Sequence, residues 1–346
     1  MPKLISLFNH KGGVSKTTTA FNLGWALATL GYRTLIVDAD PQCNLTGLVL
    51  DYNAVEDFER FYSENAGCNL YSAVEPVLDG QQRPLEPASP IGTQNPNLFL
   101  LAGNIKLSES ETQISVALGT GKTIPALRNI PGCFGSLLRE TANKHDLQYV
   151  IIDMSPSVGA LNQCLLMTSD YFVVPTFPDF FCQQAVKSLA AVLPRWNSSI
   201  QEFRNSSLLY PIPTKSPLFL GIISQKYRPR SGAPATSFQR WIDRIKTTVD
   251  THLVPALTHE GMTIHRETFQ RSISADTPYN LANIADFNSL IAQSQKHNVP
   301  IFALSDKQIE QQGVILETMR ENRDNFLKIF TELANSIVEL TSDKGR

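Results

Sequence analysis

Leu4-Ile-Ser-Leu-Phe-Asn-His-Lys-Gly-Gly-Val-Ser-Lys-Thr-Thr18 joins a short apolar segment to a glycine-rich loop. Leu4 to Phe8 is apolar and favours a buried β-strand. After the loop, apolar side chains recur at the spacing of one helix face, at Ala20, Leu23, Leu27 and Leu30. The loop is therefore expected to connect a strand to a helix.

A loop in this context is suited to bind phosphate. Gly12 and Gly13 allow a tight turn that brings backbone N–H groups close to phosphate oxygens. The helix that follows directs its positive end at the same anion. Lys16 can then reach the β- and γ-phosphates of a nucleotide, and the Thr17 hydroxyl can ligate Mg²⁺. We expect the nucleotide to contact the whole loop: Lys11, Gly12, Gly13, Val14, Ser15, Lys16, Thr17 and Thr18.

Two features separate this loop from the general pattern G-x-x-x-x-G-K-[ST]. Ser15 replaces the glycine before the lysine, and a second lysine, Lys11, precedes Gly12. Lys-Gly-Gly-x-x-Lys-Thr resembles the deviant Walker A motif of the ParA/MinD family of ATPases. The resemblance implies that Lys11 crosses an ATP-bound sandwich dimer to touch the phosphates of the partner subunit, and that Lys11 and Lys16 both serve catalysis. The alternative for Lys11 alone is a solvated loop lysine.

Carboxylates follow two further predicted strands. Thr34 to Asp38 leads into Asp38-Ala-Asp-Pro-Gln-Cys-Asn, which resembles switch I of the ParA family. This resemblance implies that Asp40 orients or activates the attacking water and that Asp38 supports the metal and water shell. Tyr149-Val-Ile-Ile-Asp153 ends as a Walker B strand does, so Asp153 is expected to hold Mg²⁺ through its water shell. An ordinary Asp-Pro turn is the alternative for Asp40.

The residue beside the nucleotide base is assigned from the resemblance alone. Leu218 to Ser224 is predicted to be a strand, and in the family this strand usually leads into an Asn next to the base. The chain has Gln225 at that position, which is our candidate for the base contact. The choice of ATP over GTP likewise follows from the family.

Seven short apolar segments alternate with helical patterns, and the loops that carry the motifs follow strand ends. This pattern predicts a P-loop NTPase fold of the α/β class, with a doubly wound, mainly parallel sheet of about seven strands flanked by helices. Val299 to Leu304 is expected to be the last strand, and Ser108 to Glu111 a capping box. We expect a single domain over 1–346, with a less regular insertion at about 51–97 and a partly helical elaboration at about 226–298.

The charge of the chain is unevenly distributed. The formal net charge is -2, which gives no overall field that would attract nucleic acid or an anionic membrane. Between residues 226 and 246, however, six basic residues stand against one acidic residue. A solvated polar face is the alternative explanation of this cluster. Its candidate DNA-binding residues are Arg228, Arg230, Arg240 and Arg244.

The family resemblance implies an ATPase that binds ATP and Mg²⁺, forms a homodimer on ATP binding and binds DNA without sequence preference. A small ParB-like or other adaptor protein would stimulate a slow basal hydrolysis, and the cycle would drive DNA partition or cargo positioning. The chain enters its first predicted strand directly, which leaves no room for a signal peptide. We therefore expect a cytoplasmic, nucleoid-associated protein that does not bind membranes.

Two other functions are weighed against this one. A MinD-like membrane-surface ATPase would end in a basic amphipathic helix, whereas the helix predicted from Asn325 to Leu340 has an acidic polar face and is expected to pack on the body of the protein. A metabolic or iron-sulfur-carrying P-loop enzyme would show paired cysteines or a substrate-pocket signature. The five cysteines are scattered and are expected to be free thiols.

Overall fold

The computed structural model describes residues 1–51, 54–65, 67–81, 84–121, 123–230, 233–273 and 277–342. Its centre is an eight-stranded sheet with the order β10-β7-β6-β1-β5-β2-β4-β3. All neighbours in this sheet pair in parallel except β3 and β4. The strands are β1 (Lys3–Leu7), β2 (Thr34–Ala39), β3 (Ile91–Gly92), β4 (Leu98–Leu101), β5 (Tyr149–Met154), β6 (Tyr171–Thr176), β7 (Leu218–Tyr227) and β10 (Asn280–Ala285).

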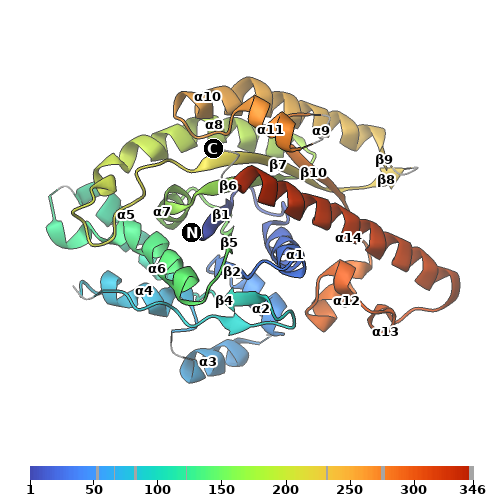
Figure 1. Ribbon diagram of the computed structural model, residues 1–346, viewed down its shortest axis with the longest axis horizontal. Coiled ribbons are helices and arrows are strands. Elements are labelled where there is room, and N and C mark those ends of the chain that lie inside the picture. Colours follow the sequence, from blue (N-terminus) through green and yellow to red (C-terminus); the bar gives the residue numbers. More distant parts are fainter. Residues whose placement is uncertain are drawn as a thin grey trace.

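Helices cover both faces of this sheet (Figure 1). The connection from β1 to β2 passes over β5, whereas the connection from β5 to β6 passes over β1 in the opposite direction. Because such crossovers are right-handed, their helices must lie on opposite faces. The predicted doubly wound, mainly parallel α/β fold is therefore confirmed. The helices of the sheet connections are α1 (Lys16–Thr29), α5 (Leu107–Thr120), α6 (Ile130–Lys144), α7 (Ala160–Thr168) and α8 (Phe180–Ser199).

The remaining elements elaborate this core. A small hairpin, β8 (Pro229–Arg230) and β9 (Ala233–Pro234), follows β7 and lies beside the start of α9. Helices α9 and α10 pack on α8, and α12 and α13 lie beside each other near α14 (Figure 1). The other helices are α2 (Asn44–Leu50), α3 (Val55–Glu64), α4 (Leu70–Leu78), α9 (Thr236–Thr248), α10 (Val254–His259), α11 (Arg266–Ser272), α12 (Leu290–His297), α13 (Asp306–Ile309) and α14 (Gly313–Thr341).

The strand register brings the sequence motifs to one edge of the sheet. Leu7, the last residue of β1, pairs with Asp153 of β5, and Asp153 pairs on its other side with Asp38 of β2. The carboxyl ends of parallel strands in such a sheet form the edge where ligands bind. The loop after β1 and the two aspartates are therefore neighbours in space.

The expected last strand is wrong. Residues Val299 to Leu304 contain a 3₁₀ turn at Ile301–Ala303, and their apolar side chains are buried because they pack on α14. Phe302, for example, lies 5.5 Å from Phe330 between ring centroids. The strand that ends the sheet is β10, which pairs with β7, and β3 adds a short antiparallel edge. The described sheet therefore has eight strands, where about seven were expected.

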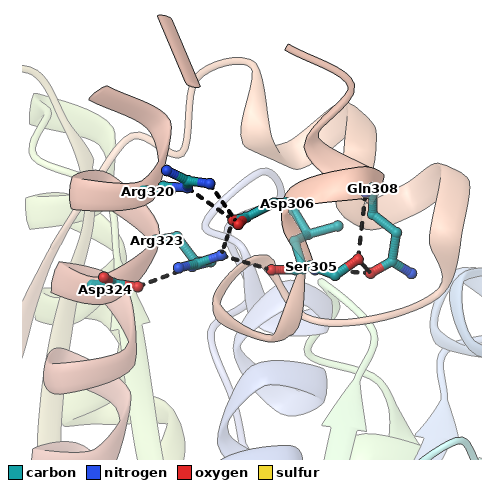
Figure 2. A network of polar contacts seen from close by, with 7 residues as sticks. Ser305, Asp306, Gln308, Arg320, Arg323 and Asp324 are labelled. Atoms are coloured by element: carbon teal, nitrogen blue, oxygen red, sulfur yellow. Dashed lines mark hydrogen bonds and ion pairs between the residues drawn. The ribbon is translucent and has the colours of Figure 1, made fainter. Parts of the chain in front are cut away.

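The long helix α14 packs on the body of the protein, as expected from its acidic polar face. Many of its apolar side chains, including Phe326, Phe330 and Ile337, are buried, and the helix lies against α1. Figure 2 shows how α13 is attached to α14: Asp306 accepts hydrogen bonds from the guanidinium groups of Arg320 and Arg323, at 2.7–3.0 Å. Among the helices of the described residues, none is long and apolar enough to cross a membrane.

Candidate functional site

A cavity of about 650 Å³ opens at the carboxyl edge of the sheet. Residues 12–18 of the glycine-rich loop form one side of it. Further lining residues are Asp40 in the loop after β2, Pro156 in the loop after β5, and Lys226 near the end of β7. The loop, the switch-I-like segment and the residues after the Walker B strand therefore meet around one space.

The loop has the backbone shape that its glycine pattern predicts. Gly13 has a φ of 75°, and Ser15 has φ 59° and ψ 33°, which is the left-handed region. The left-handed backbone conformation is energetically unfavourable for a residue with a side chain, and it is therefore usually adopted by glycine. Ser15 thus departs from the general motif in residue type while keeping a conformation that a glycine would supply. Helix α1 begins at the next residue, Lys16.

Lys16 lies over its own loop. This residue is 7% exposed. Its Nζ donates hydrogen bonds to the carbonyl oxygens of Asn9 at 2.9 Å and Lys11 at 3.4 Å. Burial lowers the pKa of the Lys16 ammonium, while the carboxylates of Asp153 and Asp40 favour its charged form. The ammonium is therefore positioned among the residues where a phosphate is expected.

Lys11 extends in another direction. Its Nζ donates to Oδ2 of Asp179 at 2.8 Å and lies 5.3 Å from the ring centroid of Phe177. Asp179 is at the same time the N-cap of α8, since its Oδ1 accepts from the N–H of Cys182 at 2.7 Å. The two lysines of the motif therefore have separate surroundings, one over the loop and one at the start of α8.

Asp38 and Asp153 lie side by side on adjacent strands and are both fully buried. Oδ2 of Asp38 accepts from the N–H and the hydroxyl of Thr46, at 2.8 and 2.7 Å. Burial nevertheless raises the pKa of Asp38 to about 6, and the neighbouring Asp40 carboxylate adds to the rise. Burial also raises the pKa of Asp153, and here the Asp38 carboxylate adds to the effect.

Asp153 differs from Asp38 in that neither carboxyl oxygen has a donor in full hydrogen-bond geometry among the described residues, although the nearby Thr17 hydroxyl lowers its pKa. A buried carboxylate without a partner is unfavourable. A hard divalent cation would supply the missing partner, because Mg²⁺ prefers carboxylate, hydroxyl and water oxygens. Thr17, which lines the cavity at the first turn of α1, offers the hydroxyl. The donor set therefore fits Mg²⁺, with Asp38 supporting the loop that carries Asp40.

Asp40 is 8% exposed and belongs to the cavity lining. Its Oδ1 accepts from the N–H of Gln42 at 3.0 Å, and its N–H donates to Oδ1 of Asp38 at 3.3 Å. These bonds fix the carboxylate at the side of the cavity facing the loop. Asp40 can therefore act on a group bound at the phosphates.

Gln225 is placed differently from the base contact that we expected. Its side chain is buried, and Nε2 donates to the hydroxyl of Thr19 in α1 at 2.5 Å. Lys226, the next residue, and Gln295 of α12 line the cavity instead. The hydrogen bond from Gln225 therefore connects the end of β7 to α1. Lys226 and Gln295 instead offer polar groups to a ligand at that end of the cavity.

The basic cluster lies largely on the surface. Arg228, Arg240 and Arg244 are exposed, and the guanidinium carbon of Arg244 lies 4.8 Å from the ring centroid of Trp241. The side chain of Arg230 lies outside the described residues. Arg240 and Arg244 are one turn apart on α9, as the helical spacing predicted.

Two buried asparagines that the motifs did not single out support the site. Asn9 links the loop to the end of β6, since its Nδ2 donates to the carbonyl of Pro175 at 2.9 Å. Asn162 of α7 donates to the carbonyls of Ser155 and Ser157, both at 2.9 Å, and so fixes the segment after Asp153. Sequence position gives a signal for Asn9, which directly precedes the loop, but none for Asn162.

Glu111 also supports the segment after β5. Its carboxylate accepts from the N–H groups of Ala160 and Leu161 at the start of α7. The expected capping box at Ser108 to Glu111 is therefore wrong, because Glu111 caps α7 and α5 already begins at Leu107, with Lys106 as its N-cap. A negative side chain at this position also matches the positive end of α7.

Comparisons with known proteins agree with this geometry. A family model described as an AAA domain matches residues 2–208. The sporulation initiation inhibitor protein Soj of Bacillus subtilis is 31% identical over 190 residues, which are 55% of this chain and 64% of Soj, so the chain spans less than two thirds of that relative. Apo McdA from Cyanothece has a similar structure, with a TM-score of 0.58, 15% identity, and 94% of this chain and 100% of McdA covered. Cobyrinic acid a,c-diamide synthase from Mycobacterium smegmatis, with bound ADP and magnesium, gives a TM-score of 0.50 at 25% identity, with 71% of this chain and 82% of that chain covered.

Proposed function

The chain belongs to the ParA/MinD family of P-loop ATPases, and we propose that it couples ATP-dependent dimerisation to non-specific DNA binding and so drives DNA partition or cargo positioning. It is an ATPase, and its cofactors are ATP and Mg²⁺. The observation that carries the proposal is the separation of the two motif lysines. Lys16 lies over its own loop, whereas Lys11 is directed to Asp179 at the start of α8.

The roles of the site residues follow from their positions. Backbone N–H groups of residues 12–18 and the ammonium of Lys16 would bind the phosphates, while Thr17 and Asp153 would hold Mg²⁺. Mg²⁺, when bound, supplies neutralisation of phosphate charge. Asp40 would orient the attacking water from the side of the cavity. Such catalysis consists mainly of positioning and charge stabilisation, so a slow basal rate is expected until a partner completes the site.

Lys11 would complete the site of a second copy. Its ion pair with Asp179 is partly buried, with the two side chains 22% and 29% exposed, and a phosphate oxygen could replace the carboxylate as the partner of the ammonium. A lysine that leaves its own loop can neutralise charge on a nucleotide held by another subunit. ATP binding would therefore stabilise a dimer that ADP does not.

DNA binding is assigned to the end of β7, the β8–β9 hairpin and α9. The cluster comprises Arg228, Arg230, Arg240 and Arg244. Within a chain of net charge -2, such a local group is where phosphates would be held. A dimer would present two copies of the cluster, which would let ATP switch DNA binding on. A small ParB-like or other adaptor would then stimulate hydrolysis and release the DNA, and the protein would be found on the nucleoid.

The two other functions fit the structure less well. A MinD-like membrane surface would need a free amphipathic helix, whereas α14 buries its apolar face on the body of the protein. A metabolic enzyme, as the likeness to cobyrinic acid a,c-diamide synthase could suggest, would need a substrate cavity continuous with the loop. A further cavity of about 910 Å³ lies instead at the start of β7, beside Asp170 and Leu218, at the other end of the strands.

The proposal is tested by binding to random-sequence duplex DNA, measured by fluorescence anisotropy with Mg²⁺-ATP, with Mg²⁺-ADP and without nucleotide. We expect measurable affinity with ATP and at least tenfold weaker binding in the other two states. Equal affinity in all three states would contradict an ATP-switched DNA-binding dimer.

A further inference from the structure

Two adjacent phenylalanines at the start of α8 are exposed to water. Phe180 is 50% exposed and Phe181 is 67% exposed, and their ring centroids are 5.6 Å apart. The ring of Phe180 also lies 6.3 Å from that of Trp241 in α9. We call Phe180, Phe181 and Trp241 the aromatic patch. Exposed apolar clusters of this kind are uncommon on soluble monomers and mark interaction sites.

The aromatic patch adjoins the phosphate-binding loop. Asp179, the residue before Phe180, accepts the hydrogen bond from Lys11 at 2.8 Å. Phe177 connects the same two regions, because Lys11 lies over its ring and Phe238 of α9 lies 6.5 Å from it between centroids. The patch therefore begins one residue from the counter-ion of the lysine that we assign to a second copy.

We propose that a second copy of this chain covers the aromatic patch when the two nucleotide cavities close on each other, so that Phe180 and Phe181 form an apolar anchor of the ATP-dependent dimer. This inference rests on the dimerisation proposed above. If Lys11 enters the cavity of a second copy, then its neighbours at the start of α8 must lie against that copy as well. The rings would then leave water in the same step that brings Lys11 to the phosphates.

The charges around the patch favour a second copy over DNA as its occupant. Lys11 is neutralised by Asp179, so the part of the surface next to the loop carries no net positive charge for a phosphate backbone. Two-fold dimers use the same surface on both subunits, so Phe180 and Phe181 can meet the second copy while Arg244, which lies over the ring of Trp241, borders the patch. Arg240 and Arg244 would remain at the rim, where they stay accessible to DNA.

The test uses the full-length protein with Mg²⁺-ATP and compares the wild type with Phe180→Ser/Phe181→Ser. The dimer dissociation constant is measured by analytical ultracentrifugation, and nucleotide affinity by titration of a dilute monomer with a fluorescent ATP analogue. We expect the variant to bind nucleotide as the wild type does and to dimerise at least ~30-fold more weakly, the loss typical of an interface hot spot. Phe180→Tyr/Phe181→Tyr should restore most of the dimerisation, since it keeps the rings.

A matched control removes two equally apolar, exposed side chains elsewhere. Val314 and Ile315, at the start of α14, are 76% and 60% exposed. Val314→Ser/Ile315→Ser should leave the dimer constant within twofold.

The possible outcomes distinguish a failure of the inference from a failure of the proposed function. Wild-type dimerisation together with an equally tight dimer of Phe180→Ser/Phe181→Ser would overturn the inference and leave the proposed function standing. A variant that dimerises normally but loses affinity for random-sequence DNA would also overturn it, because DNA would then be the occupant. Absence of an ATP-dependent dimer in the wild type would reject the proposed function and the inference together.

Discussion

Replacing Asp38 by Asn should stabilise the nucleotide-free protein in a pH-dependent way. Asp38 is fully buried, and its pKa is raised to about 6 from an ordinary value near 3.8. A carboxyl group whose pKa is higher in the folded than in the unfolded state binds its proton more tightly when folded. Raising the pH through this window therefore removes stability from the wild type, because ionisation is easier in the unfolded chain.

The size of the effect follows from the shift. About two pKa units correspond to roughly 3 kcal/mol of unfolding free energy above pH 7, and to about 1.5 kcal/mol at pH 5, where the unfolded chain is ionised and the folded protein is still protonated. Asn keeps an oxygen that can accept from Thr46, and its Nδ2 loses only the long hydrogen bond of 3.3 Å that Oδ1 accepts from the N–H of Asp40. The gain of Asp38→Asn over the wild type should accordingly grow from pH 5 to pH 7.5.

The assay is urea unfolding of both proteins at pH 5, 6, 7 and 8 without nucleotide or Mg²⁺. Asp243→Asn is the matched control, because Asp243 is an exposed carboxylate on α9 and its loss makes the same change in net charge. That control should change stability little at any of these pH values. An Asp38→Asn variant that is less stable than the wild type at pH 7.5, or whose gain in stability is independent of pH, would show that ionisation of Asp38 does not destabilise the folded protein.

Two further predictions concern the ATPase cycle. Asp40→Ala should hydrolyse ATP at least ~100-fold more slowly, as expected for loss of a positioned base, and should accumulate as an ATP-bound dimer in size-exclusion chromatography; normal adaptor-stimulated turnover of this variant would refute its assignment. Replacing Arg228, Arg230, Arg240 and Arg244 with Glu should weaken ATP-dependent binding to any duplex and reduce the slope of log affinity against log salt by roughly 0.9 for each lost phosphate contact. Basal ATP turnover without DNA should remain unchanged, and an unaltered salt slope would place the DNA surface elsewhere.

The sequence was sufficient to predict the elements whose signals are local. The apolar segment Leu4 to Phe8, the glycine-rich loop and the helix after it could be recognised because each depends on the spacing of neighbouring residues. The left-handed backbone at Ser15 was not apparent from its residue type, since serine rarely adopts that conformation. In this chain the loop shape is retained although the residue differs.

Elements that depend on distant contacts were not predictable in this way. Asn280–Ala285 forms a strand because β7 offers it an edge, although its asparagines weaken the apolar pattern. Residues Val299 to Leu304 have a better strand pattern, yet their side chains are covered by α14. Likewise, nothing in the spacing of the motifs indicates that Lys11 pairs with Asp179, which is 168 residues away in the sequence.

Light scattering with saturating Mg²⁺-ATP, together with the ATP affinity of each protein, shows whether Lys11 acts across a dimer while Lys16 acts within its own subunit. We expect the wild type to be a dimer and Lys11→Ala to be a monomer that binds ATP nearly as well. Lys16→Ala should fail to bind ATP, whereas Lys187→Ala, which removes an exposed lysine of α8, should behave as the wild type. A Lys11→Ala protein that dimerises normally, or that loses ATP affinity as fully as Lys16→Ala, would show that Lys11 does not act across a dimer.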